Sequence, residues 1–437
     1  ILRSATPEEK RELDALFARR ETLEGQMLRQ GGTQADKTLE EISTLVGRVD
    51  GLLAKIAQRV DGSNKLFSGS VDADYVRRNL RQDQALLRFF TGHLQSYAFL
   101  LAPNRPTRVV QLAGADEIMQ KVSAYRRAIQ LQAGNTAKLG EQLSNDLFGE
   151  LPELAEFEEI VVVPDGPLYL LPFSALQLPN GKPFFSLSLS ILPSARSLSF
   201  LEAPRGFVKG GEVTVFANPQ FSSGSSSESA FGIGSLRVSP EGAPAELPGT
   251  AKEADLVRRL CGQTLKVRSF EGRNASRKSL EEINQSGTLK RSRIVHFATH
   301  GFTVPEDPRL SGLILSLVDE NGRPNNGYLR LVDIYGLNLD ADLVVLSACQ
   351  TGLGTIRHGD GLLGMYQGFL TAGGRQVLTT LWSVDDEATA QFFEYFYKAL
   401  MDGRTAKESL AFAQESMLNS NQWSSPFFWA AFQIVSR

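Results

Sequence analysis

Cysteine and histidine are scarce in this chain. Its 437 residues include only two cysteines, Cys261 and Cys349, and four histidines. Two cysteines exclude a disulfide framework and a zinc site built from cysteine thiolates. This low usage is typical of proteins in a reducing compartment, so we expect a cytoplasmic location. It leaves the question whether either thiol takes part in chemistry.

Long apolar runs and a strong excess of one charge are also absent. No apolar run approaches the roughly 18 residues of a membrane-spanning helix, and the charged N-terminal segment does not have the pattern of a signal peptide. The formal net charge is only -3. This balance does not indicate a general binder of nucleic acid or membranes, and we expect neither as a direct partner.

The first part of the chain has a helical pattern. Apolar residues repeat at a strict 3-4 spacing over residues 39–60, and a similar rhythm over residues 13–27 is interrupted by Arg20. We predict an antiparallel helical hairpin within a first domain of residues 1–75. Because the chain begins with Ile1 rather than Met, we interpret the hairpin as the end of a longer tetratricopeptide-like array that recruits a controlling protein partner.

Strand-like apolar runs alternate with helical patterns after residue 75. The clearest runs are EEIVVVP (158–164), EVTVFANP (212–219), SRIVHFAT (292–299), DLVVLSA (342–348) and RQVLTTLW (375–382). This alternation predicts an α/β fold with a doubly wound, mostly parallel sheet. We divide it into a first α/β half at 76–205, which we expect to pack against the second sheet or extend it, and a second half at 206–437.

Two segments rich in glycine and serine predict loops. FSSGSSSESAFGIGS (221–235) follows the first strand of the second half, and TGLGTIRHGDG (351–361) follows Cys349. The second segment does not have the spacing of a nucleotide-binding loop, because Arg357 stands where a third glycine is required. We interpret it as a flexible loop beside a site.

The segment RIVHFATHG (293–301) places His296 and His300 four residues apart. On a helix such a pair can share a metal ion, but position 297 is Phe and the segment is rich in strand formers. On a strand, residues four apart lie roughly 13 Å apart at ~3.3 Å per residue, so they cannot hold one ion. We predict no metal site here, and we expect His296 to be a buried supporting residue.

His300 and Cys349 each follow a predicted strand, and parallel sheets form their sites at the carboxyl ends of strands. A thiol nucleophile needs a base, and a His–Cys pair suffices if the fold brings the two together. The backbone N–H groups of Gly301 and Cys349 would then form an oxyanion hole, in which one lost donor costs about 3 to 4 kcal/mol. The residues alone leave a second reading of Cys349 open, as the small buried hydrophobe that we predict for Cys261.

Several motifs resemble those of one known family. HFATHG (296–301) and LSACQTG (346–352) resemble the paired motifs of the CHAT peptidases, caspase-like cysteine proteases often attached to tetratricopeptide repeats and related to caspases, metacaspases and separases. LPGTAKEADLVRRL (247–260), GGRQVLTTLWSVDDEATAQFFEYFY (373–397) and SPFFWAAFQIV (425–435) resemble further segments of that family. Together with weaker matches upstream, the resemblance extends from about residue 80 to residue 435.

The resemblance implies a caspase-like sheet and an endopeptidase that needs no cofactor. His300 matches the family's general base and Cys349 its nucleophile, so 76–205 would be a non-catalytic half before the catalytic half at 206–437. The substrate would be a protein, and a partner would regulate the activity. The main alternative is a caspase-like scaffold with an idle dyad. A weaker one is a thiol hydrolase or acyltransferase that does not cut peptides.

The resemblance also implies a substrate pocket. WSVDD (382–386) is similar to the Trp-x-Val-x-Asp pattern of separases, which cut after arginine, so Trp382, Asp385 and Asp386 are candidate substrate-binding residues. Their acidic groups would pair with a basic residue before the scissile bond. Ser347, two positions before Cys349, is a further candidate. The alternative is that the two aspartates only begin a helix, where the helix dipole favours acidic residues.

Overall fold

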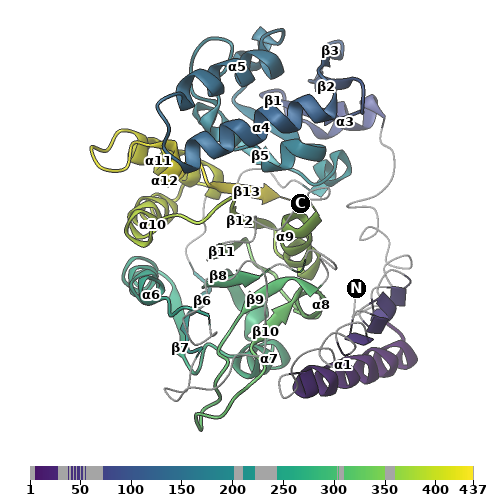
Figure 1. Ribbon diagram of the computed structural model, residues 1–437, viewed down its shortest axis with the longest axis vertical. Coiled ribbons are helices and arrows are strands. Elements are labelled where there is room, and N and C mark those ends of the chain that lie inside the picture. Colours follow the sequence, from purple (N-terminus) through teal and green to yellow (C-terminus); the bar gives the residue numbers. More distant parts are fainter. Residues whose placement is uncertain are drawn as a thin grey trace.

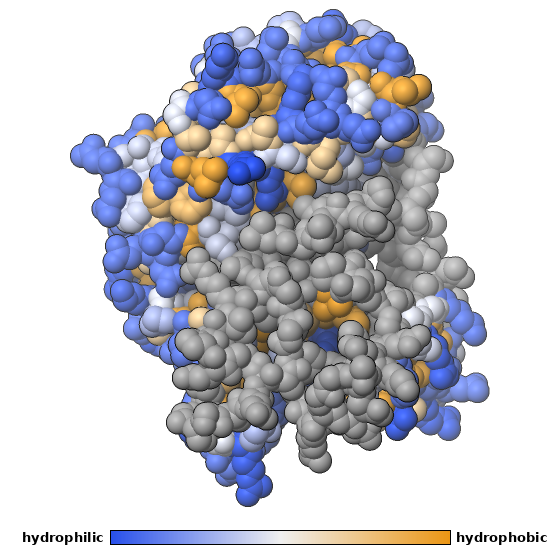
Figure 2. All heavy atoms as spheres, in the orientation of Figure 1, coloured by the Kyte–Doolittle hydropathy of each residue, from blue (hydrophilic) through white to orange (hydrophobic). Residues whose placement is uncertain are grey.

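The computed structural model describes most of the chain. Its described residues are 5–27, 38, 41–42, 44–45, 47–49, 51–52, 55, 72–200, 210–221, 244–302, 304, 310–349 and 360–436. Most of the predicted second helix and most of both glycine-rich segments therefore lie outside the described residues. Within the described ranges, no helix is long and apolar enough to cross a membrane. Hydrophilic side chains cover much of the described surface that is visible in Figure 2.

The described strands form a single 13-stranded sheet (Figure 1). The first half contributes β1 (Gln84–Phe90), β2 (Ser96–Leu101), β3 (Arg108–Leu112), β4 (Glu159–Val163) and β5 (Ser188–Ile191). The second half contributes β6 (Glu212–Pro219), β7 (Lys266–Gly272), β8 (Ser292–Phe302), β9 (Gly312–Ile314), β10 (Tyr328–Arg330), β11 (Leu343–Cys349), β12 (Gln376–Thr380) and β13 (Phe432–Ser436). Their main order is β10-β9-β8-β11-β12-β13-β5-β4-β1-β2-β3, with β6 beside β8 and β7 beside β6.

The sheet contains two parallel blocks of opposite direction. Strands β7, β6, β8, β11 and β12 run parallel to one another, and so do β13, β5, β4 and β1. The two blocks meet where β12 pairs antiparallel with β13. The carboxyl ends of β4 and β5 therefore lie at the edge opposite to the carboxyl ends of β8 and β11. Every residue of β4 and nearly every residue of β8 is buried, as expected for strands covered on both faces.

Helices cover both faces of the sheet, as the alternating pattern predicts. The described helices are α1 (Pro7–Met27), α3 (Ala73–Asn79), α4 (Ala115–Gln130), α5 (Thr136–Phe148), α6 (Pro248–Cys261), α7 (Arg277–Gln285), α8 (Leu331–Ile334), α9 (Asp360–Ala372), α10 (Asp386–Met401), α11 (Ala406–Leu418) and α12 (Pro426–Trp429). Figure 1 shows α6 and α10 on one side of β8 and β11, and α8 and α9 on the other. Successive residues of β8 confirm this, because they point to opposite faces: the ring of His296 contacts Tyr397 of α10, whereas the ring of Phe297 contacts Phe369 of α9.

The N-terminal helix packs against the second half of the chain. Leu13 and Leu16 of α1 belong to a buried cluster with Val49, and the cluster continues to Leu310 and Val332 near β9 and β10. These contacts hold the described residues of 38–55 beside α1. They also join this N-terminal region to the segment that follows β8.

Arg20 interrupts the apolar spacing of the first helix, and the structure explains why a charged residue stands at this position. Its side chain is 2% exposed and forms an ion pair with Asp333 of α8. Arg277 of α7 forms a second ion pair with the same carboxylate, at 3.6 Å. Burial opposes the charge of Asp333, but the two nearby guanidinium groups outweigh it, so the pKa of Asp333 is lowered. A buried charge pair thus links α1 to the second half.

The two halves of the sheet join between β5 and β13, where the register pairs Ile191 with Val435. A buried ion pair crosses this junction: Lys407 of α11 binds Glu159 of β4 and donates to the hydroxyl of Ser190 in β5 at 2.9 Å. The first half therefore extends the sheet of the second. Residues 201–209 lie outside the described residues, so the domain boundary at 205 stays a prediction.

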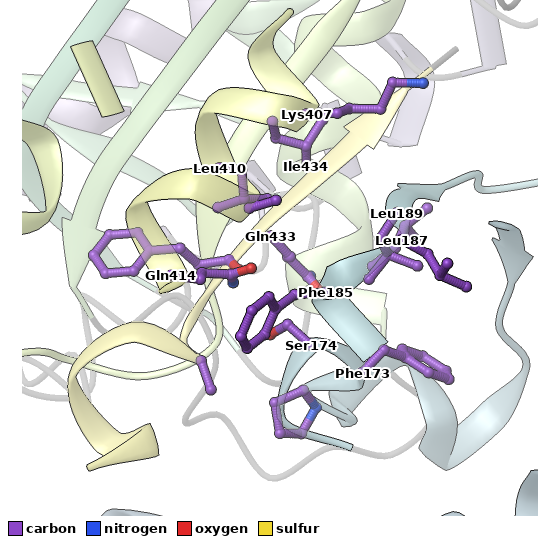
Figure 3. Close-up of a pocket in the computed structure, with 15 residues that line it drawn as sticks. Phe173, Ser174, Phe185, Leu187, Leu189, Lys407, Leu410, Gln414, Gln433 and Ile434 are labelled. Atoms are coloured by element: carbon purple, nitrogen blue, oxygen red, sulfur yellow. The ribbon is translucent and has the colours of Figure 1, made fainter. Parts of the chain in front are cut away.

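Apolar side chains fill the space beside this junction. They line a pocket of about 20 Å³, which is room for roughly one water molecule (Figure 3). Phe185 and Leu189 reach it from the first half, and Leu410 and Ile434 reach it from the second. The halves thus share one packed interior rather than a cleft.

Candidate active site

The register of two parallel strands brings His300 and Cys349 together. β8 and β11 pair continuously from Ile294 opposite Leu343 to His300 opposite Cys349. Both residues therefore stand at the carboxyl ends of neighbouring strands, about 4.8 Å apart in backbone position. This is the edge at which parallel sheets form their sites. Two motifs that lie 49 positions apart in the sequence thus meet at one point of the sheet.

A backbone carbonyl holds the ring of His300. The side chain is 7% exposed, and its Nε2 lies 2.7 Å from the carbonyl oxygen of Ala245, just before α6. A carbonyl can only accept, so Nε2 carries the proton of the neutral ring and Nδ1 is the basic nitrogen. Phe221, with its ring centroid 5.3 Å away, packs against the imidazole. His300 is therefore held in one orientation and one tautomer.

Gly301 follows His300 within β8. It is buried and stands opposite Leu313 of the antiparallel strand β9. The glycine places its backbone next to the end of β11, which is compatible with the predicted role of its N–H group. That role stays a prediction.

His296 is the centre of a buried polar network on the same face of β8. It is fully buried, with Nε2 2.6 Å from Oε1 of Glu253 in α6 and Nδ1 2.7 Å from the hydroxyl of Tyr397 in α10. Burial raises the pKa of Tyr397 well above its usual range, helped by the nearby Cys261 and Glu253, so the phenol keeps its proton. The interpretation of His296 as a buried supporting residue is confirmed.

Ser347 belongs to the same network. Its hydroxyl donates to Oε2 of Glu253 at 3.0 Å, and the residue is 8% exposed. Ser347, which we predict to contact the substrate, therefore lies beside the buried carboxylate of Glu253. The motif comparison did not identify Glu253. The sequence contained a signal for a buried carboxylate, because Glu253 falls on the buried stripe of α6 with Thr250, Ala254 and Val257. A carboxylate on an apolar stripe requires a polar partner.

Trp382 lies in the interior between the two halves. Its ring is 2% exposed, and its Nε1–H donates to the carbonyl of Phe427 at 2.9 Å. The guanidinium of Arg126 in α4 lies 5.8 Å from the ring and donates to the carbonyl of Leu381. Burial lowers the pKa of Arg126 to about 10. The indole therefore stabilises the contact between the halves.

The two aspartates after Trp382 have different surroundings. Asp385 is the N-cap of α10, and its carboxylate accepts from the backbone N–H groups of Glu387 and Ala388. This is the helix-start alternative of the sequence analysis, and for Asp385 the structure bears it out. The carboxylate of Asp386 faces Gly249 at the start of α6, where an added Cβ would lie 2.4 Å from its Oδ2. Asp386 also lines a surface groove between α6 and α10.

Cys261 is the other cysteine of the chain. It is completely buried at the end of α6, and burial raises the pKa of its thiol to about 12. A protonated, inaccessible thiol is inert, which confirms its predicted structural role.

The mostly parallel sheet with helices on both faces is a caspase-like α/β fold. The structure of the Saccharomyces cerevisiae separase–securin complex is similar to this one, with a TM-score of 0.50 over 98% of this chain and 40% of the other, at 10% identity. At so low an identity the likeness shows the fold alone. It agrees with the predicted α/β class and its mostly parallel sheet.

Sequence comparison narrows this class to one family. Residues 137–437, more than half of the chain, match the CHAT domain. The chain belongs to the CHAT-domain family. It is also 26% identical over 315 residues to tetratricopeptide repeat protein 28 of mouse (Mus musculus) and 26% identical over 310 residues to that of human (Homo sapiens). Each match covers 63% of this chain, which spans only 12% of the relative.

Proposed function

We propose that the protein is a cysteine endopeptidase whose His300 and Cys349 cleave a protein substrate. The observation that carries the proposal is the register of β8 and β11, which sets the two residues side by side at the carboxyl edge of the sheet. The orientation of the His300 ring by the Ala245 carbonyl adds to it, because a base held by a third group is typical of nucleophilic catalysis.

In this mechanism, Nδ1 of His300 takes the proton of the Cys349 thiol. The thiolate attacks the carbonyl carbon of the scissile peptide bond, and the backbone N–H groups of Gly301 and Cys349 stabilise the oxyanion. The protonated imidazole then transfers its proton to the leaving amine as the C–N bond breaks. Water, activated by the same ring, hydrolyses the thioester and restores the thiol. No cofactor takes part in these steps.

We extend the proposal to a preference for a basic residue before the scissile bond. The carboxylate of Asp386 supports it, because it lies at the surface between α10 and the start of α6. Asp385 would act only by fixing the start of α10, and Trp382 through its backbone, because its indole is bonded inside the protein. Ser347 would contribute through the carboxylate that it binds.

We also propose that a protein partner regulates the enzyme through the N-terminal helices. The buried cluster that α1 shares with Leu310 and Val332 supports this, because Leu310 lies in the segment that follows the strand carrying His300. The ion pair between Arg20 and Asp333 makes a second connection. The cytoplasm, inferred from cysteine usage, is the proposed site of action.

Cleavage of an unbiased peptide library by wild type and by Cys349→Ala tests the proposal. We expect cleavage after Arg or Lys that falls by more than about 1000-fold in the variant. Cys261→Ala is the matched control, because it removes the other thiol and should retain cleavage. Cleavage that survives Cys349→Ala would refute the nucleophile, and Cys349-dependent cleavage elsewhere would refute the basic preference. Reproducible absence of cleavage by the full-length protein with its partner would favour the idle scaffold.

A further inference from the structure

Glu253 is a buried carboxylate that contacts both strands of the candidate site. The residue is 3% exposed in the second turn of α6. One carboxylate oxygen lies 2.6 Å from His296 of β8, and the other accepts from Ser347 of β11 at 3.0 Å. A single side chain of a helix thus bonds to two neighbouring strands.

The donors and acceptors of this network fit one arrangement of protons. Tyr397 keeps its proton and donates to Nδ1 of His296, so the neutral ring carries its own proton on Nε2 and donates it to Glu253. Ser347 donates to the second oxygen. In this arrangement each oxygen of Glu253 accepts one hydrogen bond, which is how a buried carboxylate is tolerated.

The network lies directly inward from the dyad positions. His296 precedes His300 by four residues on β8, and Ser347 precedes Cys349 by two residues on β11. Even spacings return a strand to the same face. Glu253 thus holds α6 against the face of the sheet on which His300 lies, about one to two side-chain layers from the strand ends.

The same helix begins beside the segment that orients the base. Ala245, whose carbonyl contacts Nε2 of His300, precedes α6 by three residues. The hydroxyl of Thr250, in the first turn of α6, donates to the carbonyl of Leu247 and accepts from the backbone N–H of Asn218 at the end of β6. Any shift of α6 relative to β8 would therefore move the Ala245 carbonyl relative to the imidazole.

We propose that Glu253 is a positioning residue for the reaction. It locks α6 onto β8 and β11 and thereby keeps the Ala245 carbonyl on His300, which fixes the tautomer and direction of the general base. This inference rests on the proposed peptidase function. The two histidines of HFATHG then have separate tasks: His300 transfers the proton, and His296, bonded to Glu253, takes part in alignment.

Two other roles of Glu253 make different predictions. A purely structural residue would affect stability and leave the turnover of the folded enzyme unchanged. A residue that recognised the substrate side chain would change the preference before the scissile bond and KM. Misalignment of the base instead lowers kcat, since a displacement of about 1 Å can cost roughly 100-fold.

The test compares wild type with Glu253→Gln, which retains the shape and removes the charge. Asp255→Asn is the matched control, because Asp255 lies on the same helix with its carboxylate 71% exposed. We expect Glu253→Gln to lower kcat by about 10- to 100-fold with KM and cleavage preference unchanged. Asp255→Asn should match wild type. An unchanged kcat, or a changed cleavage preference, would overturn the proposal.

A second readout needs no peptide substrate. The rate at which iodoacetamide alkylates Cys349 is measured against pH, with Cys349→Ala as the blank. Pairing with a protonated imidazole extends thiolate reactivity to lower pH. Glu253→Gln should lose this reactivity at low pH, and Tyr397→Phe should lose part of it if Glu253→Gln does not fold. A wild-type profile in both variants would overturn the positioning role. Absence of acid-side reactivity in wild type would instead count against the dyad itself.

Discussion

Two buried carboxylates, one in each half of the sheet, occupy comparable positions but have different partners. Glu253 of the second half accepts from residues of β8 and β11. Glu159 of the first half lies on β4 and binds Ser190 of β5 and Lys407 of α11. In both cases one carboxylate joins a helix to two strands. Of these two networks, only the one around Glu253 contacts the strands that carry His300 and Cys349.

The direction of the strands explains the difference. The parallel blocks of the two halves run in opposite directions, so the carboxyl ends of β4 and β5 lie at the edge away from His300. Residues at those ends cannot join the site. A buried carboxylate can therefore serve assembly alone in one half and, in our proposal, assembly and alignment in the other.

The largest expected effect on activity is at His300. His300→Ala should lower kcat/KM by roughly 1000-fold or more, because it removes the general base. Thermal stability should fall as well, because the ring is buried, bonds to the Ala245 carbonyl and packs against Phe221, but a stability loss alone does not lower the turnover of the folded enzyme. Kinetics and a thermal melt on the same preparation measure both. A fully active His300→Ala would place the chemistry elsewhere.

Breaking the Glu159 network should affect stability instead of chemistry. Lys407→Met removes the buried ammonium partner of Glu159 and leaves Arg81, whose guanidinium lies 3.0 Å from the carboxylate, so the variant should lose about 3 kcal/mol of unfolding free energy, measured in urea. Lys398→Met is the control, because Lys398 is 51% exposed in its pair with Glu394. Equal losses in the two variants would show that the junction between the halves does not depend on this pair.

The same variant has a predictable pH dependence. Burial alone would raise the pKa of Glu159, but in wild type the pKa is lowered, because Lys407 and the hydrogen bonds from Gln84 and Ser190 outweigh the burial. Its contribution to stability is therefore present above the pKa of the unfolded chain and is lost as the pH falls through the lower folded-state pKa. The loss of stability in Lys407→Met should shrink in acid, because protonation neutralises the carboxylate that has lost its ammonium partner. A deficit that grows in acid would contradict this reading.

A smaller effect is expected at the N-terminal helix. Arg20→Met should destabilise the protein by about 1 to 3 kcal/mol, because Asp333 keeps Arg277 as a second partner. Limited proteolysis should then release α1 earlier than in wild type. Arg19→Met is the matched control, since Arg19 is 57% exposed in its pair with Glu41. Equal release from both variants would argue against the proposed connection.

The smallest effect concerns the substrate preference. Asp386→Asn should reduce cleavage after Arg by about 10-fold, corresponding to roughly 1.4 kcal/mol, and leave other cleavages nearly unchanged. Glu387→Gln, a neighbour that lines the same groove, is the control. A uniform loss after all residues would indicate that Asp386 only supports the start of α10.

Much of the architecture is predictable from local patterns. Alternating apolar runs and helices predict the parallel α/β sheet, because burial on both faces requires continuous apolar strands. The hairpin of β2 and β3 also follows from a local pattern, because SYAFLL (96–101) and TRVVQL (107–112) are two short apolar runs around a turn. The sequence also predicts that His300 and Cys349 each follow a strand, whereas in the structure they lie within the last residues of β8 and β11.

Tertiary structure determined which residues that are distant in sequence become neighbours. The hydrogen bonds of Glu253 span 43 and 94 positions, and the ion pair of Arg20 spans 313 positions. No local pattern specifies such pairs, because strand register and helix docking depend on the packing of the whole interior. The sequence by itself determined which residues are candidates for chemistry. Only the folded sheet determined that two strand ends meet in register and that a helix holds them there.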